Sequence, residues 1–147
     1  MAFKINLNDK SGKTYKLEAE GQGLIDKKLH EVVEGTLIAP ELEGYEFEIT
    51  GASDKSGFTS MANVEGIGTK KVLLTYGKAM KQRPKREGKK AYANKTPKGL
   101  RLRKTVRGNM ISEAIRQINF KVVKAGSKTL EEIYNPKTEE APAEEAQ

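Results

Sequence analysis

The distribution of positive charge constrains this chain more than any other feature of its sequence. Between Thr69 and Arg107, fifteen side chains are Lys or Arg, and one, Glu87, is acidic. The rest of the chain carries 12 of the 27 basic residues and 19 of the 20 acidic ones. Charge concentrated in this way creates a local field that holds a polyanion. Nucleic acid is the obvious polyanion for such a segment.

The middle of this segment has too few apolar side chains to build a core of its own. Between residues 78 and 99, Met80, Ala91, Tyr92 and Ala93 stand among Lys, Arg, Pro and Gly. The entropy lost on ordering such a stretch exceeds what its own burial can offset. We therefore expect a long basic loop that becomes ordered when its partner binds.

Composition bounds the class of protein and removes several kinds of site. A length of 147 residues fits one domain, and an apolar fraction of 36% without Trp predicts a small core. The absence of Cys excludes disulfides, thiolate zinc sites and Cys nucleophiles. The N-terminal residues alternate polar and apolar and lack the apolar run of a signal peptide or membrane span. We therefore expect a soluble, cytoplasmic protein.

Alternating apolar residues predict a mostly β fold. Residues 3–7 and 15–19 both alternate and flank the turn-rich stretch 8–12, which is the pattern of a β-hairpin. Residues 45–49 also alternate, and Glu46 and Glu48 fill the polar positions of one wet face.

The central segments are less regular. Residues 24–38 fit either a short helical turn or a strand through Val32 and Val33. Residues 51–57 offer turn formers without an apolar period, so we expect a loop. The apolar run 72–74 predicts a short buried strand that ends at Gly77.

The C-terminal part predicts two more strands and a helix. Residues 100–106 alternate apolar side chains with Arg and Lys, so a strand here carries a row of positive charge. Residues 118–122 predict the last strand. Residues 129–132 form a capping-box pattern that opens a short helix, closed by Asn135-Pro136. From residue 137 onward, Glu, Ala, Pro and Thr show no apolar period.

The predicted fold class is therefore mostly β: one small domain with a long basic loop, a short C-terminal helix and a disordered acidic tail. The domain is expected to span residues 1–134 and to include the basic segment 69–107. The tail is expected to span residues 135–147.

Other candidate sites are weaker than the basic segment. Gly12-Lys13-Thr14 lacks the upstream Gly and following helix of a phosphate-binding loop. His30 is the only histidine and is expected at the surface or half buried rather than on a metal. Glu46 and Glu48 fit a solvated strand face better than an acid and base pair. We expect no enzyme activity, no metal and no cofactor.

Three details of the basic segment favour structured RNA. Prolines and glycines stiffen or bend the loop, Tyr92 lies where an aromatic ring could stack on a base, and the charge continues into a predicted strand. RNA is preferred over DNA because no recognition helix is apparent. A freestanding RNA chaperone or translation factor stays open as an alternative. An enzyme acting on RNA is disfavoured because the chain has no histidine pair, metal set or nucleophile arrangement.

The chain also resembles a known family through four elements. These are Gly51-Ala52-Ser53-Asp54-Lys55-Ser56-Gly57-Phe58, Val72-Leu73-Leu74 before Gly77, Arg83-Pro84-Lys85-Arg86 with Gly88, and Arg103-Lys104-Thr105-Val106-Arg107-Gly108. Their order and spacing resemble small-subunit ribosomal protein six of the archaeal and eukaryotic type, from about Phe3 to Gly126.

This resemblance implies that the domain is a small antiparallel β-barrel-like domain on the small ribosomal subunit, with its basic loop laid into ribosomal RNA. It implies neighbouring ribosomal proteins as partners, no membrane, no small-molecule substrate and no catalytic residue. Eukaryotic members of the family extend into a long basic C-terminal helix with phosphorylated serines, whereas this chain finishes acidic, so regulation by kinases is not carried over. The stretch 91–99 also looks longer than in eukaryotic members.

The expected RNA-binding set combines loop 54–58, carried over by position, with basic residues of segment 69–107. Its members are Asp54, Lys55, Ser56, Gly57, Phe58, Lys70, Lys71, Lys78, Lys81, Arg83, Lys85, Arg86, Lys89, Lys90, Lys98, Arg101, Arg103, Lys104 and Arg107.

Overall fold

The structure is a computed structural model that describes residues 2–20, 22–77, 79–80 and 99–134. Most of the predicted basic loop and the whole predicted acidic tail lie outside these residues. Strands dominate the described chain, with three single 3-10 turns and one short helix. The mostly β fold class is therefore confirmed.

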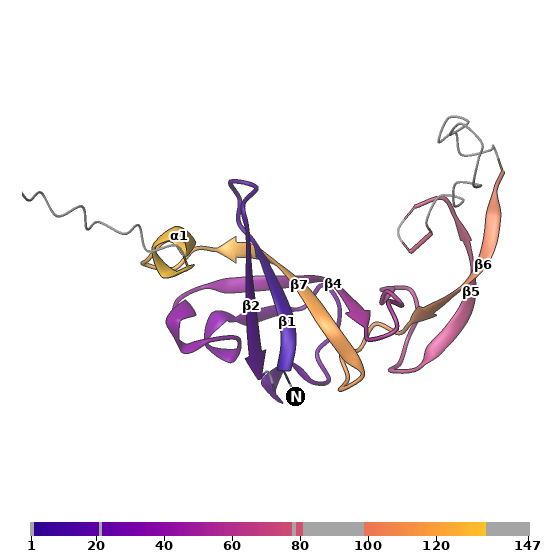
Figure 1. Ribbon diagram of the computed structural model, residues 1–147, viewed down its shortest axis with the longest axis horizontal. Helices are drawn as coiled ribbons and strands as arrows, with labels where there is room; N and C mark the ends of the chain where they lie inside the picture. The colour runs from indigo at the N-terminus through magenta and orange to yellow at the C-terminus, as the bar shows by residue number, and fades with distance from the viewer. Residues whose placement is uncertain (1, 21, 78, 81–98, 135–147) are drawn as a thin grey trace, which may run out of the picture.

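Five strands form one curled sheet in the order β2-β1-β7-β4-β3 (Figure 1). Their bounds are Ala2–Asn8 for β1, Thr14–Glu20 for β2, Val32–Glu34 for β3, Glu46–Asp54 for β4 and Ile115–Lys124 for β7. All neighbours pair antiparallel except β1 and β7, which pair parallel. The sheet is thus mixed, because the last strand inserts beside the first.

The predicted hairpin is formed by β1 and β2. Phe3, Ile5 and Leu7 of β1 are buried, and the polar residues between them face outward. Ile5 lies opposite Leu17, and Leu7 lies opposite Tyr15. The alternation in the sequence therefore marks the core face of both strands.

The centre of the core lies between β4 and β7. Phe47 and Phe120 are fully buried, and their rings meet edge to face at 6.2 Å between centroids. Tyr45, just before β4, stacks on Phe47 at 5.5 Å. Burial of each such side chain contributes about 1.5–3 kcal/mol to stability. The predicted acidic strand face is present as well, since Glu46 and Glu48 alternate with these buried residues.

The prediction of a loop over residues 51–57 is wrong for its first part. Strand β4 continues to Asp54, and Gly51 and Ala52 lie opposite Asn119 and Ile118 of β7. Ala52 is buried. Hydrogen bonds to a central neighbour hold these small residues in a strand although their intrinsic β-propensity is low. The turn itself is confined to residues 55–56.

The ambiguous segment 24–38 contains both predicted kinds of structure. Short 3-10 turns at Gln22–Leu24 and Gly35–Leu37 flank strand β3, and a third turn follows at Pro40–Leu42. Leu24 and Leu42 are fully buried in the main core. These turns therefore cover the sheet with aliphatic side chains.

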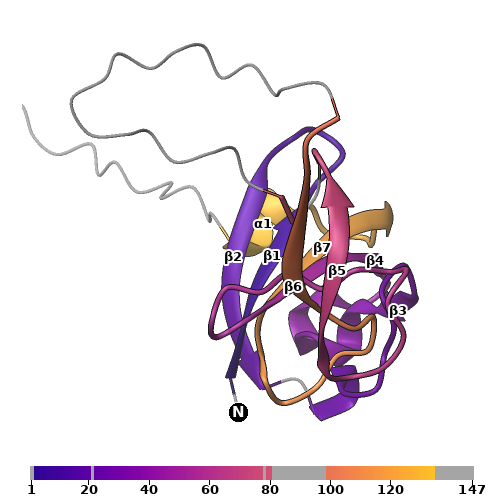
Figure 2. The same ribbon diagram turned by 90° about the vertical axis from the view of Figure 1, so that its right-hand side faces the viewer.

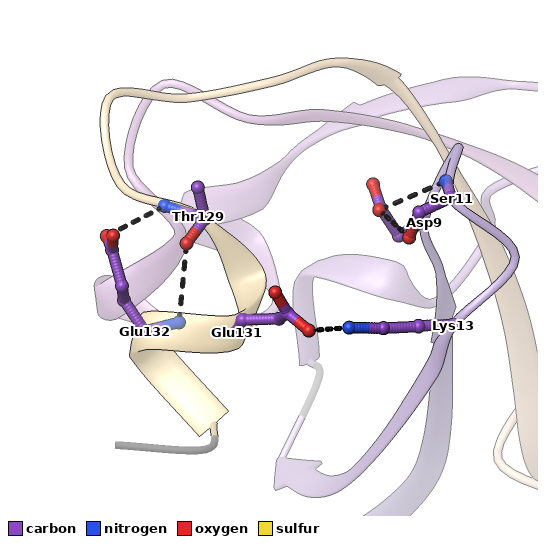
Figure 3. A network of polar contacts seen from close by, with 6 residues as sticks. All are labelled: Asp9, Ser11, Lys13, Thr129, Glu131 and Glu132. Atoms are coloured by element: carbon purple, nitrogen blue, oxygen red, sulfur yellow. Dashed lines mark hydrogen bonds and ion pairs between the residues drawn. The ribbon is translucent and has the colours of Figure 1, made fainter. Parts of the chain in front are cut away.

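The C-terminal helix α1 (Leu130–Tyr134) opens with the predicted capping box (Figure 3). The Thr129 amide donates to Glu132 Oε2 at 3.2 Å, and the Glu132 amide donates to Thr129 Oγ1 at 3.4 Å. Lys13, in the turn of the β1–β2 hairpin, forms an ion pair with Glu131. Leu130 is buried. The helix is thus attached to the tip of the first hairpin.

Strands β5 (Thr69–Thr75) and β6 (Arg101–Arg107) form a separate two-stranded ribbon. The ribbon extends from the five-stranded sheet at the end remote from α1 (Figures 1 and 2). Residues 72–74 form the predicted strand, but the prediction that it is buried is wrong, because Leu73 is 48% exposed. Strand β5 has β6 as its one strand partner in the described chain, so the other edge of β5 is not paired with a strand.

Candidate nucleic-acid interface

The ribbon carries six basic side chains without placing any two of them opposite each other. These residues are Lys70, Lys71, Arg101, Arg103, Lys104 and Arg107. Thr75 lies opposite Arg101, Leu73 opposite Arg103, and Val72 opposite Lys104. The other three cations face Val106, Thr105 and Thr69. Because like charges directly opposite destabilise a strand pair, this register allows a highly charged ribbon to form.

The register also divides the ribbon into two unlike faces, since directly opposite residues share a face. One face, the cationic face, consists of Thr69, Lys71, Leu73, Thr75, Arg101, Arg103, Thr105 and Arg107. The other, the aliphatic face, consists of Lys70, Val72, Leu74, Leu102, Lys104 and Val106. All residues of the cationic face except Thr105 and Arg107 are exposed, whereas the aliphatic residues are buried or half buried.

Within the part of the chain that the structure describes, five of the six cations have no acidic partner. Lys71, Arg101, Arg103 and Lys104 are exposed and form no ion pair with a carboxylate in the described chain. Lys70 is exposed too, and its Nζ donates to the backbone carbonyl of Glu65 at 3.2 Å. The electric fields of several exposed cations on a projecting ribbon add together. Their charge is available to a polyanion.

Arg107 behaves differently, because it fixes the base of the ribbon to the sheet. Its Nε donates to Asp54 Oδ2 at 2.6 Å, and its Nη1 donates to the carbonyl of Ile67 at 3.1 Å. The Arg107 and Asp54 side chains are 15% and 8% exposed, respectively. The backbone of Arg107 also bonds to Thr59 and Met61. A charged pair this sheltered is a structural connection between β6 and the end of β4.

Asp54 is held as an anion by its own turn. The Ser56 amide donates to Asp54 Oδ1 at 2.9 Å, and this bond, followed by the hydrogen bond and charge of Arg107, lowers the pKa of Asp54 below its ordinary value of 3.8. Partial desolvation opposes this shift. The turn leaves residues 55–58 exposed beside the base of the ribbon.

The structure therefore brings together two elements that are far apart in the sequence. The loop element at 51–58 and the strand element at 103–108 meet through Asp54 and Arg107. Both residues were expected to face RNA, and the structure makes them face each other. The carbonyls of Thr59 and Ile67, which accept hydrogen bonds from the amide and the Nη1 of Arg107, left no residue-specific signal in the sequence.

Gly108 allows two backbone segments to approach each other closely at the base of the ribbon. A Cβ atom at this position would lie 1.7 Å from the carbonyl oxygen of Gly66, a distance that real Cβ atoms do not show. The Gly108 amide donates to the carbonyl of Gly68 at 3.0 Å. The cluster of glycines at 66, 68 and 108 was the available sequence signal for this close approach of two backbones.

The remaining members of the expected RNA-binding set lie outside the described residues. They are Lys78, Lys81, Arg83, Lys85, Arg86, Lys89, Lys90 and Lys98. Their contact with RNA stays a prediction. Tyr92 lies outside as well, so the structure does not address its predicted stacking on a base.

The weaker candidate sites have ordinary positions. His30 is exposed, as predicted, and its Nδ1 lies 2.9 Å from Glu48 Oε1. Gly12-Lys13-Thr14 runs from the hairpin turn into β2. Among the described residues, no three His, Cys, Asp or Glu side chains gather as metal ligands would. No helix in that part of the chain has the length and apolar character needed to cross a membrane.

Comparison with known proteins assigns the family. The family model of "Ribosomal protein S6e" matches residues 3–135. A protein of Methanococcus maripaludis named "Small ribosomal subunit protein eS6" is 42% identical over 131 residues, covering 88% of this chain and 94% of that protein. Proteins of the same name from Methanocaldococcus jannaschii and Archaeoglobus fulgidus are 40% and 38% identical, covering 84% and 95% of this chain and 83% and 100% of their own lengths. The resemblance drawn from the sequence motifs is thereby confirmed, and the chain belongs to the ribosomal protein S6e family.

Proposed function

We propose that this chain is a structural constituent of the small ribosomal subunit and binds ribosomal RNA through its basic segment, residues 69–107. The observation that carries the proposal is the ribbon of β5 and β6, on which five exposed cations have no acidic partner in the described chain. The printed name of its relatives, "Small ribosomal subunit protein eS6", supports the ribosomal setting.

The proposed mechanism is binding rather than chemistry. Lys70, Lys71, Arg101, Arg103 and Lys104 contact phosphates, and Lys55 adds a charge at the base of the ribbon. The basic residues of 78–98 extend this surface. Asp54 and Arg107, which bind each other, orient the ribbon instead of contacting RNA themselves. Phosphate contacts of this kind position a protein on RNA and carry little sequence information.

The expected setting is the ribosome in the cytoplasm, with ribosomal RNA and neighbouring ribosomal proteins as partners. The competing function is a freestanding RNA-binding translation factor or chaperone. The two functions differ in residence, because a constituent stays on the subunit at high salt and a factor leaves it.

Sedimentation tests the ribosomal part of the proposal. The tagged chain, expressed in cells of its own source, is run through a high-salt sucrose gradient. We expect it to travel with the small subunit. If it remains at the top of the gradient at high salt and sediments at low salt, the transient factor is the better description.

The salt dependence of binding tests the RNA part of the proposal. Each neutralised phosphate contributes about −0.7 to −0.9 to the slope of log affinity against log salt, so seven to ten contacts give a slope of about −5 to −9. A slope shallower than about −2 would contradict an extended phosphate interface. The double substitution of Arg101 and Arg103 by Gln should make the slope less steep by about 2.

A further inference from the structure

We propose that the cationic face of the ribbon binds the minor groove of an RNA duplex and that its threonine hydroxyls contact ribose 2′-hydroxyls. This inference rests on the proposed RNA-binding function and adds the class of RNA and the part of it that is read.

The shape of the ribbon fits a wide, shallow groove. Six residue steps separate the Thr69–Arg107 pair from the Thr75–Arg101 pair, which corresponds to about 20 Å of antiparallel strand. The two strands lie about 5 Å apart, so the face is long and narrow. The minor groove of A-form RNA is wide and shallow and displays 2′-hydroxyls, whereas the major groove is too deep and narrow to be read by side chains.

The chemistry of the cationic face matches that groove. Thr69, Thr75 and Thr105 share this face with Lys71, Arg101 and Arg103, so a hydroxyl lies opposite or diagonal to each cation. None of these three hydroxyls forms a hydrogen bond to a described residue. A hydroxyl both donates and accepts, as a 2′-hydroxyl does. The cations reach the phosphates that border the groove, while the hydroxyls face its floor.

Two further features favour a duplex over a single strand. Proteins bind single strands largely by stacking bases on aromatic rings, and the cationic face contains no aromatic residue. Its one large apolar side chain is Leu73, which is 48% exposed among the cations. An aliphatic side chain offers contact to sugars rather than a flat surface for a base. The aliphatic residues on the reverse side are buried or half buried, so the exposed hydroxyls lie on the cationic face, while the exposed Lys70 and Lys104 of the reverse side add positive charge.

The test measures the affinity of the full-length protein for three probes at one salt concentration. These are a mixed-sequence RNA duplex of 20 base pairs, the DNA duplex of the same sequence and one RNA strand alone. We expect the RNA duplex to bind about tenfold more tightly than either of the others. The variant carrying Thr69→Val and Thr75→Val should lose about three- to tenfold in affinity for the RNA duplex, since each hydrogen bond changes affinity severalfold. Its affinity for DNA and its salt slope should not change.

Valine retains the β-branched shape of threonine, so these substitutions preserve the strand. As a control outside the ribbon, Thr14→Val alters an exposed threonine of β2, whose Oγ1 donates to Asn8 Oδ1 at 2.7 Å, and should leave all three affinities unchanged. Equal binding of RNA and DNA duplexes, tighter binding of the single strand, or an equal loss for all probes in the double variant would overturn the inference. Steep salt dependence with any of those outcomes leaves the proposed function intact. Weak, salt-insensitive binding of every RNA would overturn the proposed function itself.

Discussion

The five-stranded sheet and the two-stranded ribbon are both built from β-strands, but they differ in what stabilises them. In the sheet, β4 and β7 bury Phe47 and Phe120 at the centre of the core and pair with neighbours on both sides. In the ribbon, Val106 is the one fully buried residue of the two strands. The sheet is therefore stabilised by burial, and the ribbon depends on its register and on its attachment to the sheet.

Removal of a large side chain from each region should give the largest difference in unfolding free energy between the two regions. Phe120→Ala should cost about 3–5 kcal/mol of unfolding free energy, since it leaves a cavity in the core. Leu73→Ala should cost less than about 1 kcal/mol, because that side chain is half exposed. Urea unfolding of both variants measures the difference. Similar losses in both would mean that the ribbon belongs to the same core as the sheet.

The junction between the regions should be the next most sensitive point. Gly108→Ala forces a Cβ atom against the carbonyl of Gly66 and should cost about 1–3 kcal/mol. Gly68→Ala is the matched control, because a Cβ there meets no atom within 4 Å. Amide exchange should show lost protection in β5 and β6 of the Gly108 variant and retained protection in β4 and β7. Uniform loss across both regions would contradict a local junction.

A substitution in the ion pair at the junction should change RNA affinity in the direction opposite to that expected from charge alone. Asp54→Asn removes a negative charge beside a cationic ribbon, which by charge alone should strengthen RNA binding. We expect it to weaken binding about three- to tenfold, since the single amide oxygen of Asn cannot accept from both the Ser56 amide and Arg107 Nε, and the negative charge that orients Arg107 is lost. Glu65→Gln, in an exposed position near the ribbon, is the control and should bind RNA slightly more tightly. Filter binding at fixed salt measures both.

The same pair also gives a pH dependence. The pKa of Asp54 is lower in the folded protein than its ordinary value of 3.8, so the ionised carboxylate stabilises the fold above that pH. This contribution is lost as the pH falls through the folded pKa. The stability difference between the wild type and Asp54→Asn should therefore be constant at neutral pH and shrink in acid. A difference that persists unchanged at pH 2 would show that the charge of Asp54 plays no part.

The smallest expected effect concerns the register of the ribbon. Thr75→Lys places a second cation opposite Arg101 and should destabilise the strand pair by about 0.2–1 kcal/mol. Thr75→Glu should stabilise the pair by a similar amount and yet weaken RNA binding. Amide exchange in β5 and affinity for RNA are measured on both variants. A change of stability and affinity in the same direction would contradict the prediction.

The sheet could be predicted from the sequence wherever the pattern was local. The alternation at Phe3, Ile5 and Leu7 and the capping box at Thr129 each depend on neighbours a few residues away, and both predictions are confirmed. The parallel pairing of β1 with β7 joins residues more than a hundred positions apart. No local pattern encodes such a pairing, because the favourable contacts exist only after the chain has closed.

In the ribbon, local sequence patterns predicted less of the structure than they did in the sheet. Its charged strand at 101–107 was predicted from alternation, but the exposure of Leu73 was not, since an apolar run does not reveal how many neighbours its strand will have. Likewise, Gly51 and Ala52 signalled a loop in isolation and became part of β4 through pairing with β7. In the candidate site, the positive charges were visible in the sequence, and the partnership of Asp54 with Arg107 was not.

Helix α1 and the ribbon lie at opposite ends of the long axis of the molecule (Figure 1). Helix α1 is fixed to the first hairpin through Lys13 and Glu131, so its last residue, Tyr134, has a defined exit point remote from the cationic face. A dye, affinity tag or tether joined beyond that point would begin at the far end of the domain. Immobilised by that end, the protein would present its ribbon unobstructed to RNA in solution, which suits single-molecule measurements of binding and release.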